Sequence, residues 1–342
     1  MTSRETTCSS ATDETHSNSH VIWGSLVGGL GAVVYTAANT CLRSATHCDP
    51  MWVCFWKSLP VAVLTAVPFM WHVRGECRRA VSRSDWSLLM GVTVLSLWGN
   101  FMFQIALGVI GLALAVPVTL GSVIVSGAVL GRFLLGESLT RQIMLALAVL
   151  ITAIFVLSFG ADDASRSLVA EQNTGPRSLV KVVLTLVGLF TAGFSFCSVG
   201  AAIRVTANHG VPIVFGIFVN GVVLSIAFAL IAAYRIGLDG MLRTPSIDLA
   251  VMASAGVFNA MGFWLVTTAI RMCGLIHVNA INASQSAMAA TAGVIFFAEP
   301  VTSHLLFGVL LTILGLAIMK QPRQGHPQTL DRALAEPAVE HS

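Results

Sequence analysis

Apolar stretches separated by short polar gaps run along this chain from Val21 to Met319. Each stretch is about 15 to 25 residues long, which is the length that a helix needs to cross roughly 30 Å of hydrocarbon. A helix also satisfies its own peptide groups where water is absent, and the alternating pattern of a transmembrane strand is missing. We therefore expect an all-α integral membrane protein with ten transmembrane helices. The predicted spans are Val21–Cys41, Met51–Trp71, Trp86–Val109, Leu112–Leu135, Ile143–Phe159, Val182–Ala202, Pro212–Tyr234, Leu249–Ile270, Ile276–Ala298 and Leu305–Met319.

The second half of the chain repeats the pattern of the first half with a register of 162 residues. In both halves an apolar helix rich in small residues leads into the element Gly-x5-Glu-x2-Thr. We expect a first repeat over residues 21–159, a linker over 160–180 and a second repeat over 181–320. Because each repeat has five spans, the two copies are expected to insert in opposite orientations, as inverted-repeat carriers do. The repeated element pairs Gly131 with Gly293, Glu137 with Glu299 and Thr140 with Thr302.

Composition and charge agree with a membrane protein and exclude other classes. Only 10% of the residues are charged and the mean hydropathy is +0.81, whereas charged residues make up about a quarter of a soluble chain. The net charge of +3 is spread over loops without a basic run, which disfavours a nucleic-acid partner. The seven cysteines lack paired spacing. The sequence therefore predicts no metal site, no cofactor and no disulfide framework.

Both ends of the chain are polar and lie outside the predicted spans. Residues 1–20 are rich in Ser, Thr and His, and residues 321–342 are polar with prolines, so we expect two unstructured tails. Lys and Arg number 12 on one side of the predicted helices and 6 on the other. An excess of Lys and Arg marks the cytoplasmic side, which places both termini in the cytoplasm.

Two five-helix halves, each with a small-residue helix, the Gly-x5-Glu-x2-Thr element and a final helix, resemble the EamA family of the drug/metabolite transporter superfamily. The likeness covers residues 21–320. It implies a secondary transporter of the plasma (inner) membrane, whose central cavity is lined mainly by the first, third, fourth, sixth, eighth and ninth spans. Relatives on this scaffold move amino acids, nucleotide-sugar-like molecules and other small metabolites. Glu137 and Glu299 match the family glutamate, and we expect them to be structural, because a carboxylate near the start of the next helix favours its positive end.

Polar side chains inside the predicted spans are the candidates for substrate binding, because each needs a partner or a water-filled cavity. Asn100 and Gln104 share one helix face, so their amides can offer donors and acceptors to the same ligand. The alternative is that such side chains hold helices together, through bonds worth about 0.6 to 2 kcal/mol each. The candidate binding residues are Asn100, Gln104, Asn279, Asn282, Gln285, Asn259, Trp264 and Lys57.

Lys57 is the only Lys or Arg well inside a predicted span. Its long side chain either reaches the non-cytoplasmic interface or provides a cation at the outer mouth of the cavity. No Asp or Glu occupies the middle of a span, so a carboxylate that trades a proton for a cationic drug is missing. We expect an exporter or exchanger of neutral, zwitterionic or anionic metabolites, unless a group such as His277 couples protons.

Two other classes compete with a transporter. An intramembrane enzyme needs a catalytic set in the bilayer, and the sequence contains no HExxH element and no pair of membrane aspartates. We therefore expect that the chain is not an enzyme. A membrane scaffold or sensor that transports nothing is compatible with the sequence, which also leaves the oligomeric state open and allows a monomer.

Overall fold

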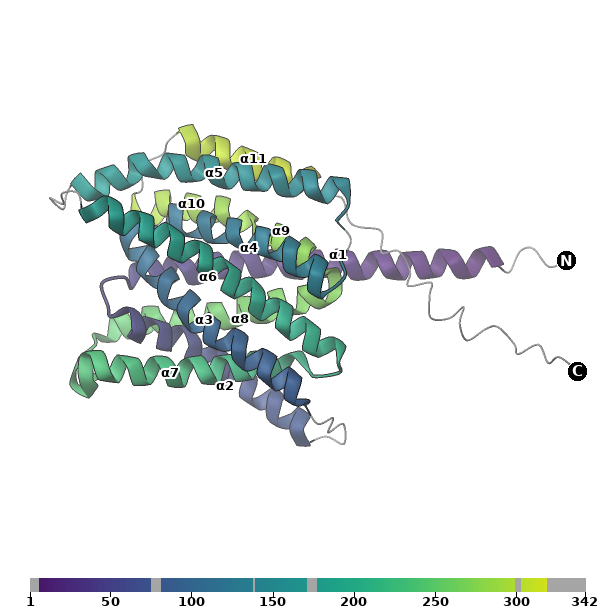
Figure 1. Ribbon diagram of the computed structural model, residues 1–342, viewed down its shortest axis with the longest axis horizontal. Helices are drawn as coiled ribbons and strands as arrows, with labels where there is room; N and C mark the ends of the chain where they lie inside the picture. The colour runs from purple at the N-terminus through teal and green to yellow at the C-terminus, as the bar shows by residue number, and fades with distance from the viewer. Residues whose placement is uncertain (1–5, 75–80, 138, 171–176, 299–302, 319–342) are drawn as a thin grey trace, which may run out of the picture.

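The computed structural model describes residues 6–74, 81–137, 139–170, 177–298 and 303–318, which form a bundle of α-helices (Figure 1). The described part contains no β-strand. The helices are α1 (Thr6–Ser44), α2 (Pro50–Arg74), α3 (Arg83–Ile110), α4 (Leu112–Leu134), α5 (Arg141–Ala170), α6 (Arg177–Asn208), α7 (Ile213–Leu242), α8 (Ser246–Cys273), α9 (Leu275–Asn282), α10 (Ser284–Phe297) and α11 (Ser303–Ile318).

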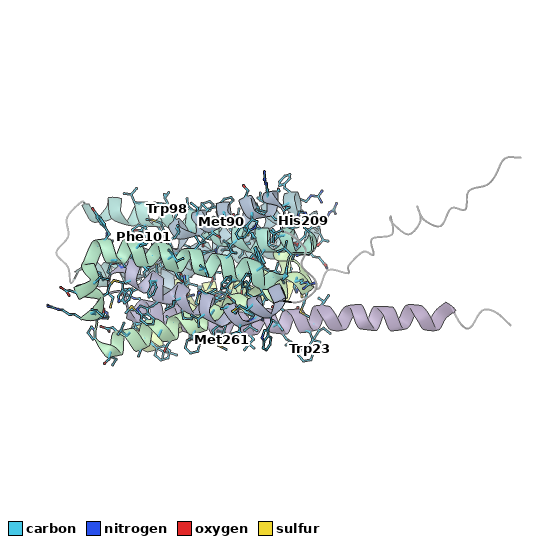
Figure 2. All side chains as sticks on the ribbon, turned by 90° about the horizontal axis from the view of Figure 1, so that it is seen from below. Trp23, Met90, Trp98, Phe101, His209 and Met261 are labelled. Atoms are coloured by element: carbon cyan, nitrogen blue, oxygen red, sulfur yellow. The ribbon has the colours of Figure 1, made fainter. Side chains whose placement is uncertain are left out.

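Eight segments of the described residues are long and apolar enough to cross a membrane. They correspond to α1, α2, α3, α4, α6, α7 and α8, with α9 and α10 together as the eighth. Shorter apolar segments lie in α5 and α11, over Arg141–Ala153 and Leu306–Gly315. Large apolar side chains such as Trp23, Trp98 and Met261 are exposed on the outside of the bundle (Figure 2). A surface of this kind suits lipid, which confirms the membrane-spanning helical character.

Helices from the two halves of the chain interleave in one bundle. Helix α1 packs along α8, α2 packs along α7 and α8, and α6 packs against both α3 and α4. Helix α4 also contacts α9 and α10, while α5 and α11 lie side by side at the edge of the bundle (Figure 1). Small residues allow the close approach: a Cβ at Gly256 in α8 would collide with the backbone carbonyl of Trp56 in α2.

Local side chains and glycines define where several helices begin and end. The Asp49 carboxylate accepts hydrogen bonds from the backbone amides of Met51 and Trp52 at 2.9 and 3.3 Å, which caps the N-terminus of α2. The Ser82 hydroxyl caps α3 in the same way, by accepting from the backbone amide of Asp85. Gly111 ends α3 and Gly274 ends α8 with positive φ angles of 78° and 94°, which favour glycine.

Some boundaries differ from those that the sequence pattern predicts. Helix α1 begins at Thr6 and leaves the bundle as a continuous helix, where an unstructured tail was expected (Figure 1). Helix α5 continues to Ala170 and α6 begins at Arg177, so helix occupies most of the expected linker over residues 160–180. The ninth expected span is divided at Ala283 into α9 and α10. Glu299 and the expected tail over residues 321–342 lie outside the described residues.

Candidate functional site

A cavity of about 170 Å³ lies among α1 to α4 and α6 to α10. Six of the eight candidate binding residues line it, namely Lys57, Asn100, Asn259, Asn279, Asn282 and Gln285. Helices α2 and α7 contribute to the lining in addition to the spans that the EamA resemblance implies. Its wall therefore combines polar residues from both halves of the chain.

Two candidate residues lie away from the cavity. Trp264 is 38% exposed on the outside of the bundle and is not among the cavity-lining residues. Gln104 is buried, but its side-chain amide donates to the backbone carbonyl of Leu42 at 3.3 Å and thereby joins α3 to α1. The Gln104 Oε1 atom has no hydrogen-bond partner among the described residues. Gln104 thus matches the alternative in which a membrane amide holds two helices together.

Helices α9 and α10 contribute three amides to the cavity wall, those of Asn279, Asn282 and Gln285. Gln285 Nε2 donates to Asn282 Oδ1 at 3.2 Å, and Asn279 Nδ2 contacts Cys197 Sγ at 3.5 Å. The helix tightens between these residues, since the Ser286 amide donates to the carbonyl of Ala283, three residues earlier, at 3.0 Å. Interrupted helices at a central cavity are a recurrent way for carriers to present polar groups to a substrate.

Asn100 faces the cavity from α3. Its Nδ2 atom donates to the Ser96 carbonyl at 2.8 Å and to the Ser96 hydroxyl at 3.1 Å. Because both bonds use the amide nitrogen, the Oδ1 acceptor keeps its hydrogen-bonding capacity for a ligand or water. Asn220 faces the cavity from α7 and donates to Thr93 at 3.3 Å.

Lys57 is a charged residue on the cavity wall. The side chain is only 8% exposed, and its Nζ atom lies 5.3 Å and 5.4 Å from the ring centroids of Phe103 and Phe196. It forms no hydrogen bond or ion pair with any residue in the described ranges. Its position on the cavity wall, between two aromatic rings, differs from that of a lysine that reaches the membrane surface.

Other cavity-lining residues were not among the sequence candidates. Thr267 is 3% exposed, and its hydroxyl has no hydrogen-bond partner among the described residues. Tyr35, Asn39 and Ser58 also line the cavity. A polar residue near a helix end, such as Asn39, gives no sequence signal that separates a cavity position from an interfacial one. His277, which the sequence suggested for proton coupling, is absent from the lining and lies 3.0 Å from the Ser25 hydroxyl.

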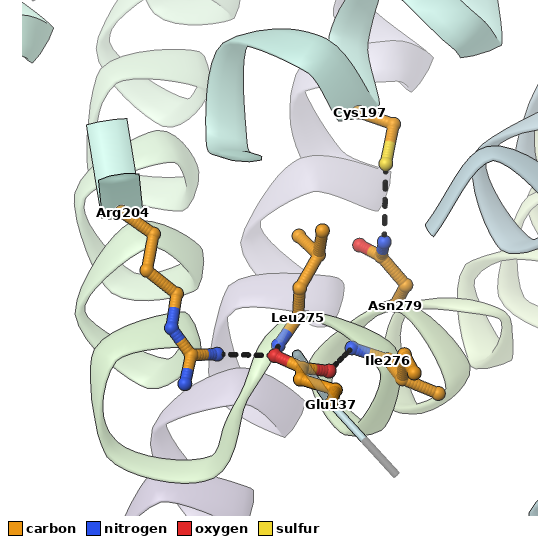
Figure 3. Close-up of polar contacts among 6 residues, drawn as sticks. All are labelled: Glu137, Cys197, Arg204, Leu275, Ile276 and Asn279. Carbon is orange, nitrogen blue, oxygen red and sulfur yellow. Dashed lines mark hydrogen bonds and ion pairs between the residues drawn. The ribbon is translucent and has the colours of Figure 1, made fainter. Parts of the chain in front are cut away.

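Glu137 joins the two halves of the chain through polar contacts (Figure 3). It lies just after the C-terminus of α4, at the end of the bundle that is here called the Glu137 end. Its carboxylate accepts a hydrogen bond from Arg204 Nη1 at 2.6 Å. It also accepts from the backbone amides of Leu275 and Ile276, at 2.7 and 3.0 Å. Glu137 therefore caps α9 instead of the next helix along the chain, α5, which the sequence suggested. A Cβ at Gly274 would lie 3.1 Å from the Glu137 carboxylate, so glycine makes room for this contact.

More exposed ion pairs occupy the opposite end of the bundle, here called the Asp49 end. Arg235 donates to Asp49 at 3.0 Å, and His47 lies 3.1 Å from Asp248. The Cys48 thiol completes a group of three potential metal ligands with His47 and Asp248, whose ligand atoms lie within 4.8 Å of one another. Because the His47 side chain is 61% exposed and already pairs with Asp248, we interpret this group as an ion pair beside a thiol.

Comparisons with known proteins describe the fold and no function. No family model matches the sequence, and no curated protein matches it. A solved structure described only as "Crystal structure of protein" has a TM-score of 0.58, with 14% identity. The match covers 86% of this chain and 97% of that chain. At this identity the likeness shows a shared fold alone.

Proposed function

We propose that this chain is a secondary transporter of the EamA type, which moves a small neutral, zwitterionic or anionic metabolite by alternating access. The observation that carries the proposal is a cavity between the halves of the chain that is lined by amides, hydroxyls and one lysine among apolar side chains. At both ends of the bundle, ion pairs join one half of the chain to the other. Glu137 pairs with Arg204 and Asp85 with His209 at one end, while Asp49 pairs with Arg235 and His47 with Asp248 at the other. Contacts of this kind can be exchanged when the cavity opens at either end.

The packing of the helices supports ten spans in two inverted repeats. If α6, α7, α8, α9 with α10, and α11 repeat α1 to α5, then the α1–α8 contact corresponds to the α3–α6 contact. In the same way, the contact of α2 with α8 corresponds to that of α7 with α3. Three further contacts join a helix to its own counterpart in the other repeat, and exchanging the repeats leaves them unchanged. They are α2 with α7, α4 with α9 and α10, and α5 with α11. A two-fold relation between repeats, with the site at their interface, is the architecture of many carriers.

The proposal includes the orientation of the chain in the membrane. We infer that both termini face the cytoplasm of the plasma (inner) membrane, on the Lys and Arg bias of the sequence. Reporter fusions after His20 and after Ser342 test it. Both fusions are expected to give fluorescence from a cytoplasmic reporter and no alkaline phosphatase activity. Phosphatase activity at one terminus alone would contradict the ten-span topology, and activity at both would contradict the inferred orientation.

Counterflow in proteoliposomes tests the transport function itself. Vesicles that contain the purified protein are each loaded with one metabolite from a panel of amino acids, organic acids and amides. For at least one member of the panel, the vesicles should accumulate the labelled form of the loaded metabolite. Asn282→Ala and Gln285→Ala are expected to lower uptake at least about threefold, because each removes an amide from the cavity wall. Trp264→Ala is the matched control outside the cavity and should keep wild-type uptake. If no panel member exchanges, the scaffold or sensor alternative replaces the transporter.

A further inference from the structure

The lining of the cavity, as far as the described residues form it, carries one formal positive charge and no negative charge. Among its lining residues Lys57 is the only ionisable lysine, arginine, histidine, aspartate or glutamate. The other polar groups on the wall are hydroxyls, amides and a thiol, including Asn100, Asn259 and Thr267. A buried ammonium needs a counter-ion or dipoles that face it, and the described protein provides no counter-ion.

The aromatic rings beside Lys57 replace only a small part of the water that the ammonium loses on burial. Phe103 and Phe196 lie on opposite halves of the chain, in α3 and α6, and their rings approach Nζ from 5.3 and 5.4 Å. Their faces attract a cation, but they leave its net charge in place. Since Lys57 lines the cavity and its ammonium has no acceptor among the described residues, acceptor oxygens of a ligand in the cavity could receive its hydrogen bonds.

We propose that the transported substrate is an organic anion with a single negative charge, most simply a monocarboxylate, and that Lys57 is its counter-ion. This inference rests on the proposed transport function and names the substrate class of the same cavity. A carboxylate near Nζ neutralises the one charge of the cavity and accepts charge-assisted hydrogen bonds. The amide of Asn100 and the hydroxyl of Thr267 supply further neutral hydrogen bonds.

Other charge types fit this wall less well. A zwitterionic amino acid would bring a second ammonium into a cavity whose described wall contains no carboxylate to receive it. A phosphate monoester carries between one and two negative charges at neutral pH, and its second charge would lack a cation. A cationic compound would meet Lys57 in a low-dielectric space and be repelled. The apolar part of the wall, which includes Val116, Leu120 and Leu224, suits the hydrocarbon part of a monocarboxylate.

The test compares compounds with closely similar hydrocarbon chains that differ in charge. The first series is 4-methylpentanoate, leucine, 4-methylpentanamide and 3-methylbutyl phosphate, and a smaller series is propanoate, alanine and propanamide. Binding is measured as the ligand-induced rise in Tm of the purified full-length protein, and exchange is measured by counterflow. We expect at least one carboxylate to raise the Tm at concentrations about tenfold lower than those needed by its zwitterionic, neutral or dianionic counterparts.

Variants of Lys57 connect the selectivity to this side chain. Lys57→Gln should raise the half-saturating carboxylate concentration about tenfold or more, whereas Lys57→Arg should keep it within about threefold. Arg271→Gln removes an exposed positive charge elsewhere and is the matched control, with no expected change. If Lys57→Gln fails to fold, the charge selectivity of the wild-type protein still decides the matter.

The outcomes separate this inference from the proposed function. If carboxylates bind and Lys57→Gln weakens them, but no compound is exchanged, the anion site stands and the transport function fails. If the wild type exchanges amides or zwitterions as well as carboxylates, the transport function stands and the inference is overturned. The absence of a Tm shift with any carboxylate also overturns it.

Discussion

At the Glu137 end the carboxylate is 15% exposed and accepts three hydrogen bonds from the other half of the chain. At the Asp49 end the Arg235 side chain is 49% exposed and donates one bond to Asp49, and His47 is 61% exposed. Exposed ion pairs contribute little to stability, because water and salt screen them and long side chains lose entropy. A partly buried carboxylate that pairs with a guanidinium and caps a helix contributes more.

The difference indicates which end holds the halves of the bundle together more strongly in this conformation. Under the alternating access that we propose, the stronger contacts must be released when the cavity opens at the Glu137 end, and the weaker ones when it opens at the Asp49 end. If the proposed transport function holds, opening of the Glu137 end is therefore expected to be the step that requires more free energy. Substitutions that weaken only this end should favour opening there and lower stability in the same experiment.

The largest effect is expected from Glu137→Ala. It leaves Arg204 and the first amides of α9 without their acceptor, and we expect the free energy of unfolding to fall by about 2 to 3 kcal/mol. Arg235→Ala, at the Asp49 end, should lower it by less than about 1 kcal/mol. Unfolding of the purified proteins in detergent, followed by circular dichroism, measures both. Equal losses for the two variants would mean that the ends do not differ.

A pair of glycines sharpens the comparison through the backbone. Gly274 at the Glu137 end has φ 94° and ψ 157°, and Gly237 in α7 has φ 69° and ψ 167°, a region that only glycine adopts readily. An added Cβ at Gly274 would lie 3.1 Å from the Glu137 carboxylate and 3.2 Å from Arg204, whereas at Gly237 nothing lies within 4 Å.

Both glycine substitutions carry a backbone cost of about 1 to 3 kcal/mol, so their difference isolates the contact with the ion pair. Gly274→Ala should lower the free energy of unfolding by about 1 kcal/mol more than Gly237→Ala, and it should lower counterflow where Gly237→Ala does not. The same unfolding and uptake assays apply. If Gly237→Ala lowers the free energy of unfolding more than Gly274→Ala does, the contact of Gly274 with the ion pair does not add to the backbone cost.

Sequence patterns predict which segments are helical and apolar more readily than which face of a helix lines the cavity. Lipid is as apolar as the packed interior, so a spanning helix carries only a weak difference between its faces. Asn282 and Gln285 line the cavity. The sequence marked them as candidates because amides are costly against lipid. The side chain of Trp264 is apolar enough to face either lipid or the cavity, and only the structure shows that it is exposed on the outside of the bundle. The Gln104 side chain donates a hydrogen bond to a backbone carbonyl of α1, and the spacing of residues along one helix cannot predict a partner on another helix.

The sequence also did not predict which groups bind the Glu137 carboxylate. Its place in a repeated element marked it as structural, and a carboxylate near a helix N-terminus was the expected arrangement. The helix that it caps, however, begins at Leu275, 138 residues further along the chain. Only the packing of α4 against α9 brings these groups together. The continuation of α1 back to Thr6 likewise depends on an existing helix that polar residues can extend.

The smallest effects are expected from the two exposed histidine pairs, one at each end. His209 lies 2.8 Å from Asp85 with its side chain 58% exposed, and His47 lies 3.1 Å from Asp248 with its side chain 61% exposed. His209→Ala and His47→Ala should each change the free energy of unfolding by less than about 1 kcal/mol, and by similar amounts, because exposed pairs are screened. Detergent unfolding at low and high salt measures this. If His209→Ala lowers the free energy of unfolding as much as Glu137→Ala does, both ion pairs stabilise the Glu137 end, and the Glu137 carboxylate is not its main contact.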